Sequence, residues 1–478
     1  MNSIARNYIY NVLYNILVLF APLITAPYLA RILGAEKLGI YSYVNSATSI
    51  IISISIIGLY SYGSRQIAYV RDDRQKLSQE FWNLMGLRLI LCVFGTIVYF
   101  SYASQTDYLT YFALYYAYYL GNALDCTWLF VGVEDMKIPT LKNIVAKLAS
   151  VAGIFLLVKN ENDLWKYVLL LACATLGGMM LTYPQIGRYA DFFKPNIKSY
   201  KKHIIGAVIL FLPSLVSTIY LQMDKVMIEW LTGETAQISY YDQAEKIVMI
   251  PLTFITVLST VMMPRIANEF ANHNRERITE LLTKACRVSL FMAFPLMFGI
   301  AGIAGCFIPW YLGSEFLATA KVLMILSPIV LSNTLVGISG TQYFIATNQV
   351  KILLVSNSLA ALLNITVNAL LIPKFGYVGA AVATLISNYT LVIVQYYALS
   401  KQLTVKKMFR NTWRYLAASI MMFAVVFGIG SISSPRPLTT ILQIIAGMIV
   451  YFGIMLIIRD DLTRESLEQI QRRVERHE

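Results

Sequence analysis

The stretch CRVSLFMAFPLMFGIAGIAGCFIPW, residues 286–310, decides the fold class of this chain. After Arg287 it carries no charged side chain as far as Trp310. A helix of about 20 apolar residues crosses the hydrocarbon core of a bilayer, where it satisfies its own backbone hydrogen bonds. The stretch therefore predicts a transmembrane helix.

The composition of the whole chain extends this interpretation. Of its 478 residues, 57% are hydrophobic and only 14% are charged, and the mean hydropathy is +0.61. Soluble domains carry about a quarter charged residues. The net charge of +13 could indicate nucleic acid, but the charges are confined to short gaps between apolar runs, which is typical of membrane orientation. The five cysteines form no paired spacing and are expected to pack in apolar surroundings.

Further apolar runs predict an all-α polytopic membrane protein with about 14 transmembrane helices. The first run is too long for a cleavable signal peptide and lacks the small-residue cleavage pattern. The expected spans lie near residues 7–30, 39–62, 81–103, 107–131, 140–158, 164–187, 203–230, 240–263, 286–310, 317–345, 350–372, 377–400, 413–432 and 437–458.

The distribution of Lys and Arg predicts the orientation, because cytoplasmic loops carry an excess of both. With the N-terminus in the cytoplasm, the inner gaps and the two tails hold 28 of the 39 Lys and Arg residues. The outer gaps hold seven, and four fall inside spans. This bias favours fourteen spans with both termini cytoplasmic.

Short internal matches indicate a duplicated architecture. Residues 23–29 align with 215–221, and residues 172–176 align with 381–385, so that a span matches the span six further along the chain. The expected organisation is an N-lobe of six spans, a basic cytoplasmic linker, a C-lobe of six spans, two extra spans and a charged cytoplasmic tail. Their bounds are 1–187, 188–202, 203–400, 401–458 and 459–478. A cavity between two parallel lobes would open alternately inward and outward.

Ionisable side chains at bilayer depth are functional candidates, because burying them in lipid is costly. Arg88 and Lys147 each lie about seven residues, or about 10 Å, inside the cytoplasmic end of their span, and Asp125 lies at similar depth. Asp224 and Arg31 lie toward the outer face. Two interpretations stay open for the basic residues: snorkelling to the interface, or binding of an anion. For the outer charges the alternative is a structural ion-pair network.

Polar and aromatic stripes add further candidates. Asn7, Asn11 and Asn15 share one face of the first span, where their amides could bind a sugar or bond helix to helix. Tyrosines crowd the outer half of the fourth span and are expected to form an interfacial aromatic belt. They are Tyr111, Tyr115, Tyr116, Tyr118 and Tyr119.

Several motifs that carry enzymatic chemistry are missing from the sequence. It has no GxxxxGK[ST] phosphate loop, no HExxH and no GxSxG, and its three histidines lie in cytoplasmic flanks. We therefore expect no enzyme, no cofactor and no metal. A secondary transporter or a flippase is favoured. The expected outer gaps between spans are short, which argues against a membrane-embedded polymerase with a catalytic outer loop.

Three motifs resemble a known family. LGAEKLGIY at residues 33–41, DKVMI at 224–228 and PKFGYVGAA at 373–381 are similar to the Wzx-type polysaccharide flippases. These belong to the multidrug/oligosaccharidyl-lipid/polysaccharide exporter superfamily, and the resemblance runs nearly end to end.

The resemblance implies a flippase of the bacterial cytoplasmic membrane. It would move undecaprenyl-pyrophosphate-linked oligosaccharide repeat units from the inner to the outer leaflet for O-antigen, capsule or exopolysaccharide, working beside a polysaccharide polymerase and a chain-length regulator. Arg88 and Lys147, and more weakly Arg31, would hold the diphosphate, and Asp125 or Asp224 would be linked to H+ or Na+. The alternatives are a cation-coupled multidrug exporter or a lipid II exporter of the same superfamily; the first span lacks the carboxylate that many multidrug exporters carry.

Overall fold

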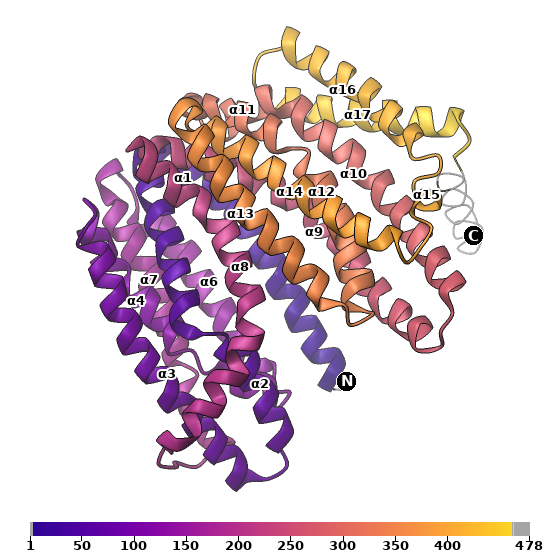
Figure 1. Ribbon diagram of the computed structural model, residues 1–478. Coiled ribbons are helices and arrows are strands. Elements are labelled where there is room, and N and C mark those ends of the chain that lie inside the picture. Colours follow the sequence, from indigo (N-terminus) through magenta and orange to yellow (C-terminus); the bar gives the residue numbers. More distant parts are fainter. Residues whose placement is uncertain (1–2, 461, 463–478) are drawn as a thin grey trace, which may run out of the picture. The chain divides into compact units, whose positions relative to one another are not determined.

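The computed structural model describes residues 3–460 and residue 462. The side chains of residues 3–19, 209–210, 213–214, 254, 256–258 and 260–261 lie outside the description. Within these limits the chain is helical and contains no strand (Figure 1). This confirms the all-α class expected from the apolar runs.

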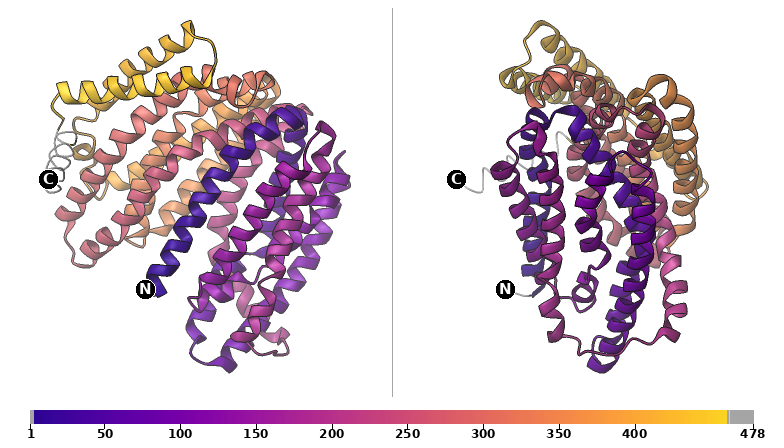
Figure 2. Two further views of the ribbon diagram at one scale, coloured as in Figure 1. Left: turned by 180° about the vertical axis from the view of Figure 1, so that it is seen from behind. Right: turned by 90° about the vertical axis from the view of Figure 1, so that its left-hand side faces the viewer.

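The chain divides into two compact units, residues 1–239 and 240–478. The helices of the first unit run nearly parallel to one another, as in a bundle (Figure 2). Within it α4 packs on α7 and α1 packs on α8. Its helices are α1 (Ser3–Ile56), α2 (Leu59–Val70), α3 (Arg74–Ala103), α4 (Leu109–Ala123), α5 (Thr127–Gly132), α6 (Lys137–Leu157), α7 (Leu164–Met180) and α8 (Tyr200–Thr232).

The second unit begins inside a helix, because α9 (Thr235–Ala271) runs across the division. In this unit α13 packs on α14, and α16 packs on both α10 and α17. Its other helices are α10 (Arg275–Tyr311), α11 (Leu317–Leu326), α12 (Ile329–Val336), the π-helix η5 (Gly337–Ile345), α13 (Val350–Phe375), α14 (Tyr377–Ser400), α15 (Val405–Met408), α16 (Trp413–Ile432) and α17 (Pro437–Ile457). The division differs from the expected linker at 188–202, and the proposed two-lobe scheme stays a prediction.

Among the described residues, nine helices are long and apolar enough to cross a membrane, or ten if one bent pair counts as a single span. The number is below fourteen partly because α1 merges two expected spans into one element, while the fourth expected span is split into α4 and α5. A multi-pass membrane protein is confirmed. The count of fourteen and the sidedness of the termini stay predictions.

A kink in α1 separates its two expected spans. Gly34 has φ 73° and ψ 176°, which is a conformation that glycine adopts without a steric penalty. Beyond it the helix resumes, and Gly39 approaches the first turn of α9 so closely that a Cβ there would lie 1.8 Å from the carbonyl oxygen of Thr235. The motif at residues 33–41 therefore combines a bend with a close contact between backbones.

The segment that joins α7 to α8 is held against α3 by hydrogen bonds. Arg74 donates two hydrogen bonds to the carboxylate of Asp191, at 2.7 and 2.8 Å, and the indole of Trp82 donates to the Asp191 carbonyl at 2.9 Å. Further along, the side chain of Asn83 accepts from the backbone amide of Asn196 at 2.7 Å. The expected linker is therefore an ordered strap, which we define as residues 188–199.

We expect Asp191→Asn to release this strap. The adjacent Arg74 guanidinium lowers the pKa of the Asp191 carboxyl, so the pair stabilises the fold above the ordinary carboxyl pKa and loses that contribution as the pH falls through the lowered value. At neutral pH the variant should be cut several-fold faster by trypsin after Lys198. The exposed Asp72→Asn is the matched control, and equal cleavage rates in the two variants would show that Arg74 does not hold the strap.

Candidate functional site

The fourth expected span, residues 107–131, is broken near its middle. α4 ends at Ala123 and α5 begins at Thr127. Asp125 lies in the break, and its carboxylate accepts hydrogen bonds from the Thr127 amide at 3.3 Å and the Thr127 hydroxyl at 2.5 Å. An aspartate that bonds the backbone two residues ahead competes with the helix, so the local sequence favours a break. We call residues 122–127 the α4–α5 junction.

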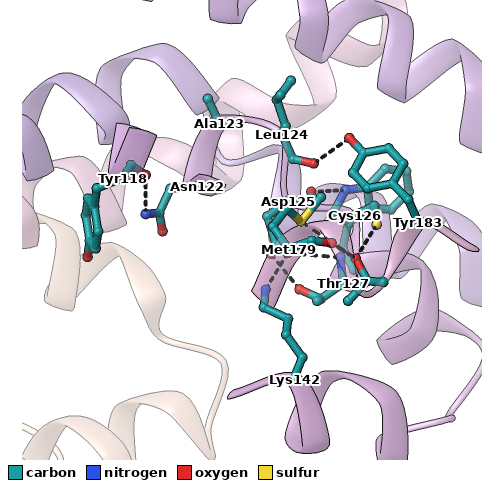
Figure 3. A network of polar contacts seen from close by, with 12 residues as sticks. Tyr118, Asn122, Ala123, Leu124, Asp125, Cys126, Thr127, Lys142, Met179 and Tyr183 are labelled. Atoms are coloured by element: carbon teal, nitrogen blue, oxygen red, sulfur yellow. Dashed lines mark hydrogen bonds and ion pairs between the residues drawn. The ribbon is translucent and has the colours of Figure 1, made fainter. Parts of the chain in front are cut away.

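The end of α4 is capped by side chains from other helices. Arg88 on α3 donates from Nε to the Ala123 carbonyl at 2.5 Å and from Nη2 to the Asn122 carbonyl at 2.8 Å. The Tyr183 hydroxyl donates to the Leu124 carbonyl at 3.1 Å (Figure 3). Carbonyls at a helix end have no partner within the helix, and these three find theirs in the surrounding protein.

Arg88 is only 2% exposed, so its charge lies inside the first unit. Its Nη1 atom is buried and makes no hydrogen bond to any described residue. Two of the three guanidinium nitrogens are therefore used by the backbone, and Nη1 is the donor that a ligand could take. Arg88 thus has a structural role in the junction, and the ligand-binding role expected from the sequence stays a prediction.

Asp125 is paired with a lysine that the sequence did not single out. Lys142 Nζ lies 3.0 Å from Asp125 Oδ1, and the two side chains are 16% and 13% exposed for the acid and the lysine (Figure 3). The charge pattern of the sequence places Lys142 in the cytoplasmic gap 132–142. In the structure α6 begins at Lys137, so Lys142 stands one turn inside a helix and faces the junction. Lys142 follows Asp125 by only 17 residues. This short separation between an intramembrane acid and a lysine is the sequence signal that could have indicated the pair.

The junction is also bonded to the end of α7. The Thr182 hydroxyl lies 3.1 Å from Cys126 Sγ and donates to the Met179 carbonyl at 2.7 Å, while the Trp128 indole donates to the Asp125 carbonyl at 3.0 Å. The non-helical segment is therefore held from α3, α6 and α7 together. With the buried Arg88, the partly buried Lys142 and one carboxylate, the junction carries an excess of one positive charge.

The other expected site residues are spread over the first unit. Lys147 lies on α6, half-buried and about 7–8 Å further along the helix than Lys142. Arg31 is exposed on α1, and Asp224 is buried on α8. The side chains of Asn7, Asn11 and Asn15 lie outside the described residues. The structure thus brings Arg88, Asp125 and Lys142 together at the junction, and the roles of the remaining residues stay predictions.

The tyrosines of α4 pack inward more than a membrane belt requires. Tyr115 and Tyr119 are 1% and 0% exposed. The Tyr115 hydroxyl donates to Asn45 Oδ1 on α1 at 2.9 Å, and the half-buried Tyr118 stacks on Tyr115 with ring centroids 4.5 Å apart. Tyr115 and Tyr119 therefore pack within the first unit and do not form an interfacial belt.

Known protein sequences are similar to this chain. A family model described as polysaccharide biosynthesis protein matches residues 4–270. A probable low-salt glycan biosynthesis flippase of Haloferax volcanii is 23% identical over 440 residues, covering 90% of this chain and 91% of the relative. A putative O-antigen transporter of Escherichia coli is 23% identical over 395 residues, covering 80% and 93%.

Solved structures share the fold. A lipid II flippase in an inward closed conformation superposes with a TM-score of 0.71 at 17% identity, covering 96% of this chain and 99% of that chain. An inward-facing multidrug resistance MATE family transporter of the MOP superfamily gives a TM-score of 0.63 at 14% identity, covering 86% and 95%. At these identities the likeness establishes the architecture alone.

Proposed function

This chain belongs to the polysaccharide biosynthesis protein family, as a Wzx-type flippase of the MOP superfamily, and from that premise we propose that it translocates undecaprenyl-pyrophosphate-linked oligosaccharide repeat units. The units would move from the inner to the outer leaflet of the bacterial cytoplasmic membrane by alternating access. A polysaccharide polymerase and a chain-length regulator would then use them.

The observation that carries this proposal is the end-to-end similarity to proteins described as glycan flippases or O-antigen transporters. It spans 90% of this chain and 91% of one such relative, so it is not confined to one segment. The buried positive excess at the α4–α5 junction supports it, because a diphosphate headgroup needs cations when it leaves water.

We assign the headgroup to the basic residues of the first unit. Arg88 would offer Nη1 to a phosphate oxygen, and Lys147 would add a second cation from α6, with Arg31 as a weaker contributor. The carboxylates of Asp125 and Asp224 would respond to the coupling ion, H+ or Na+.

The sugars require polar and aromatic contacts of their own. Asn7, Asn11 and Asn15 would hydrogen-bond to them, and the Tyr118 ring would stack on a pyranose face. Selectivity for one repeat unit over another would then depend on these amides and this ring and not on the diphosphate-binding cations.

We expect lipid-linked repeat units to accumulate on the inner leaflet of cells that lack this protein. An impermeant glycan probe applied to spheroplasts measures the outer pool directly. A Lys147→Ala protein at unchanged abundance should also lower the outer pool strongly, because one of two headgroup cations is lost. Lys351→Ala, which removes an exposed lysine on α13, is the matched control.

The same measurement separates the alternatives. Single units that reach the outer leaflet but do not polymerise would replace the flippase by a polymerase. A normal outer glycan pool together with an inner accumulation of lipid II would favour lipid II as the substrate, the activity named for the structure with the 0.71 TM-score. Sensitivity to cationic drugs as the sole defect would favour multidrug export.

A further inference from the structure

A histidine is buried where α8 begins. His203 is 1% exposed and lies between α2 and α3. Its Nδ1 is 3.3 Å from the Tyr62 hydroxyl, and its Nε2 is 3.5 Å from Oε2 of Glu80, whose side chain is 24% exposed. We call these three residues the His203 cluster.

The cluster is held in place from three sides. A Cβ at Gly206 would lie 2.4 Å from the Tyr62 ring, so α8 and α2 meet with no room between them. The strap fixes the chain just before α8, because Asn83 accepts from the Asn196 amide, and a Cβ at Gly86 would lie 2.3 Å from the Tyr200 hydroxyl. The imidazole therefore keeps its two neighbours without any large movement of the helices.

Both protonation states of His203 fit this geometry. In the neutral tautomer with the proton on Nε2, Nδ1 accepts from the Tyr62 hydroxyl, and Nε2 lies 3.5 Å from Glu80 Oε2 without forming a hydrogen bond to it. When a proton binds at Nδ1, the new N–H donates to the Tyr62 oxygen, whose own hydrogen turns away. Only one hydroxyl rotates, while the backbone and the ring stay where they are.

The surrounding charges act in opposite directions on the protonated form. Burial is the largest effect on His203 and disfavours its protonated form. Glu80 stabilises an imidazolium against that effect, and Lys202, the preceding residue on α8, opposes it further. Arg65 on α2 lies 5.8 Å over the Tyr62 ring and adds a second cation nearby. A buried imidazolium needs a counterion, and the partly exposed Glu80 supplies one while also connecting the site to solvent.

We infer that His203 is a proton-binding site of this protein, loaded through Glu80. Uptake of one proton converts the contact between a neutral imidazole and the Glu80 carboxylate into an ion pair, which ties the N-terminal end of α8 more firmly to α3. Its role as the coupling site for H+ rests on the proposed flippase function. The binding of the proton itself does not.

The chain has only three histidines, so imidazole nitrogen NMR can follow each of them. The full-length protein, labelled with 15N-histidine and held in lipid nanodiscs, is titrated over about pH 5–8, the range in which histidine changes charge. His203→Gln assigns the resonance, and exposed His273 is the internal control. We expect His203 to take up a proton, with an affinity at least about tenfold lower in Glu80→Gln.

Tyr62→Phe tests whether the Tyr62 hydroxyl sets the tautomer of His203, which a purely structural role for the histidine would not require. Without the hydroxyl donor, the neutral imidazole should become a mixture of the two tautomers, visible in its 15N shifts. A His203 resonance that stays neutral throughout the titration would overturn the proton site. So would a Glu80→Gln protein that titrates like the wild type.

The spheroplast measurement tests the coupling role separately. Translocation by the wild type should depend on pH, and His203→Gln should remove that dependence. If the wild type translocates and His203→Gln keeps the same pH dependence, the coupling role is wrong. If cells with the wild type have the same outer pool as cells that lack the protein, the proposed flippase function is wrong, and so is the coupling role. The titration still decides whether His203 binds a proton.

Discussion

Arg88→Ala is expected to remove most of the folded protein, and glycan export with it. The change leaves the Ala123 carbonyl without its Arg88 donor and leaves the Asn122 carbonyl with only the Asp125 amide, at 3.3 Å. Each unsatisfied buried group costs about 1–3 kcal/mol, which is a large share of a net stability of about 5–15 kcal/mol. Lysine at position 88 should rescue only in part, since a single ammonium cannot reproduce the guanidinium fork.

Two measurements check this expectation. The apparent melting temperature of the detergent-purified protein should fall well below that of the wild type, and the membrane abundance should fall with it. Arg188→Ala, which removes an exposed arginine at the start of the strap, is the matched control. If Arg88→Ala kept a normal melting temperature and abundance while export disappeared, the capping role would be dispensable and the headgroup role would stand alone.

Gly39→Ala is expected to be nearly as damaging, although it adds one methyl group. The new Cβ would lie 1.8 Å from the carbonyl oxygen of Thr235 and 2.4 Å from its carbonyl carbon, so backbone has to move. The flanking Leu38 and Ile40 are 3% and 6% exposed, which prevents α1 from rotating to relieve the clash. Loss of export and a lower melting temperature should follow.

Gly177→Ala is the matched control for this substitution. Gly177 lies on α7, where a Cβ would meet no described atom within 4 Å, and alanine is favoured over glycine in a helix by about 1 kcal/mol. The control should therefore be neutral or slightly stabilising. A Gly39→Ala protein as stable as Gly177→Ala would mean that the start of α9 does not rest on α1.

The class of fold could be predicted from the sequence because each long apolar run predicts a transmembrane helix. The stretch at residues 286–310 predicted a transmembrane helix, and α10 runs from Arg275 to Tyr311. The gap expected between the first two spans is a kink at Gly34 within α1. The break in the fourth span was missed, because apolar runs continue on both sides of residues 124–127 while a single aspartate redirects the backbone.

The composition of the junction was predictable only in part. Arg88 and Asp125 were identified from their depth, which is a property of sequence position. The partners of Arg88 are backbone carbonyls, and these have no signature in a sequence. Lys142 was assigned to a loop because the charge rule counts a lysine at the end of a span as cytoplasmic.

The histidine at position 203 illustrates a different limit. By sequence it is one of three histidines in cytoplasmic flanks, with no motif around it. Its partners Tyr62 and Glu80 precede it by more than a hundred residues, and they meet it only because α2, α3 and α8 pack together. Contacts of this range depend on tertiary packing, which local patterns do not encode.

The capped end of α4 also bears on which ions the first unit needs. Broken helices in membrane transporters present carbonyl dipoles at which dissolved cations can be coordinated. Here the carbonyls of Asn122 and Ala123 already hold the guanidinium of Arg88. The cation at this break is a covalent part of the chain and cannot dissociate. The capping of these two carbonyls therefore needs no dissolved cation from either side of the membrane.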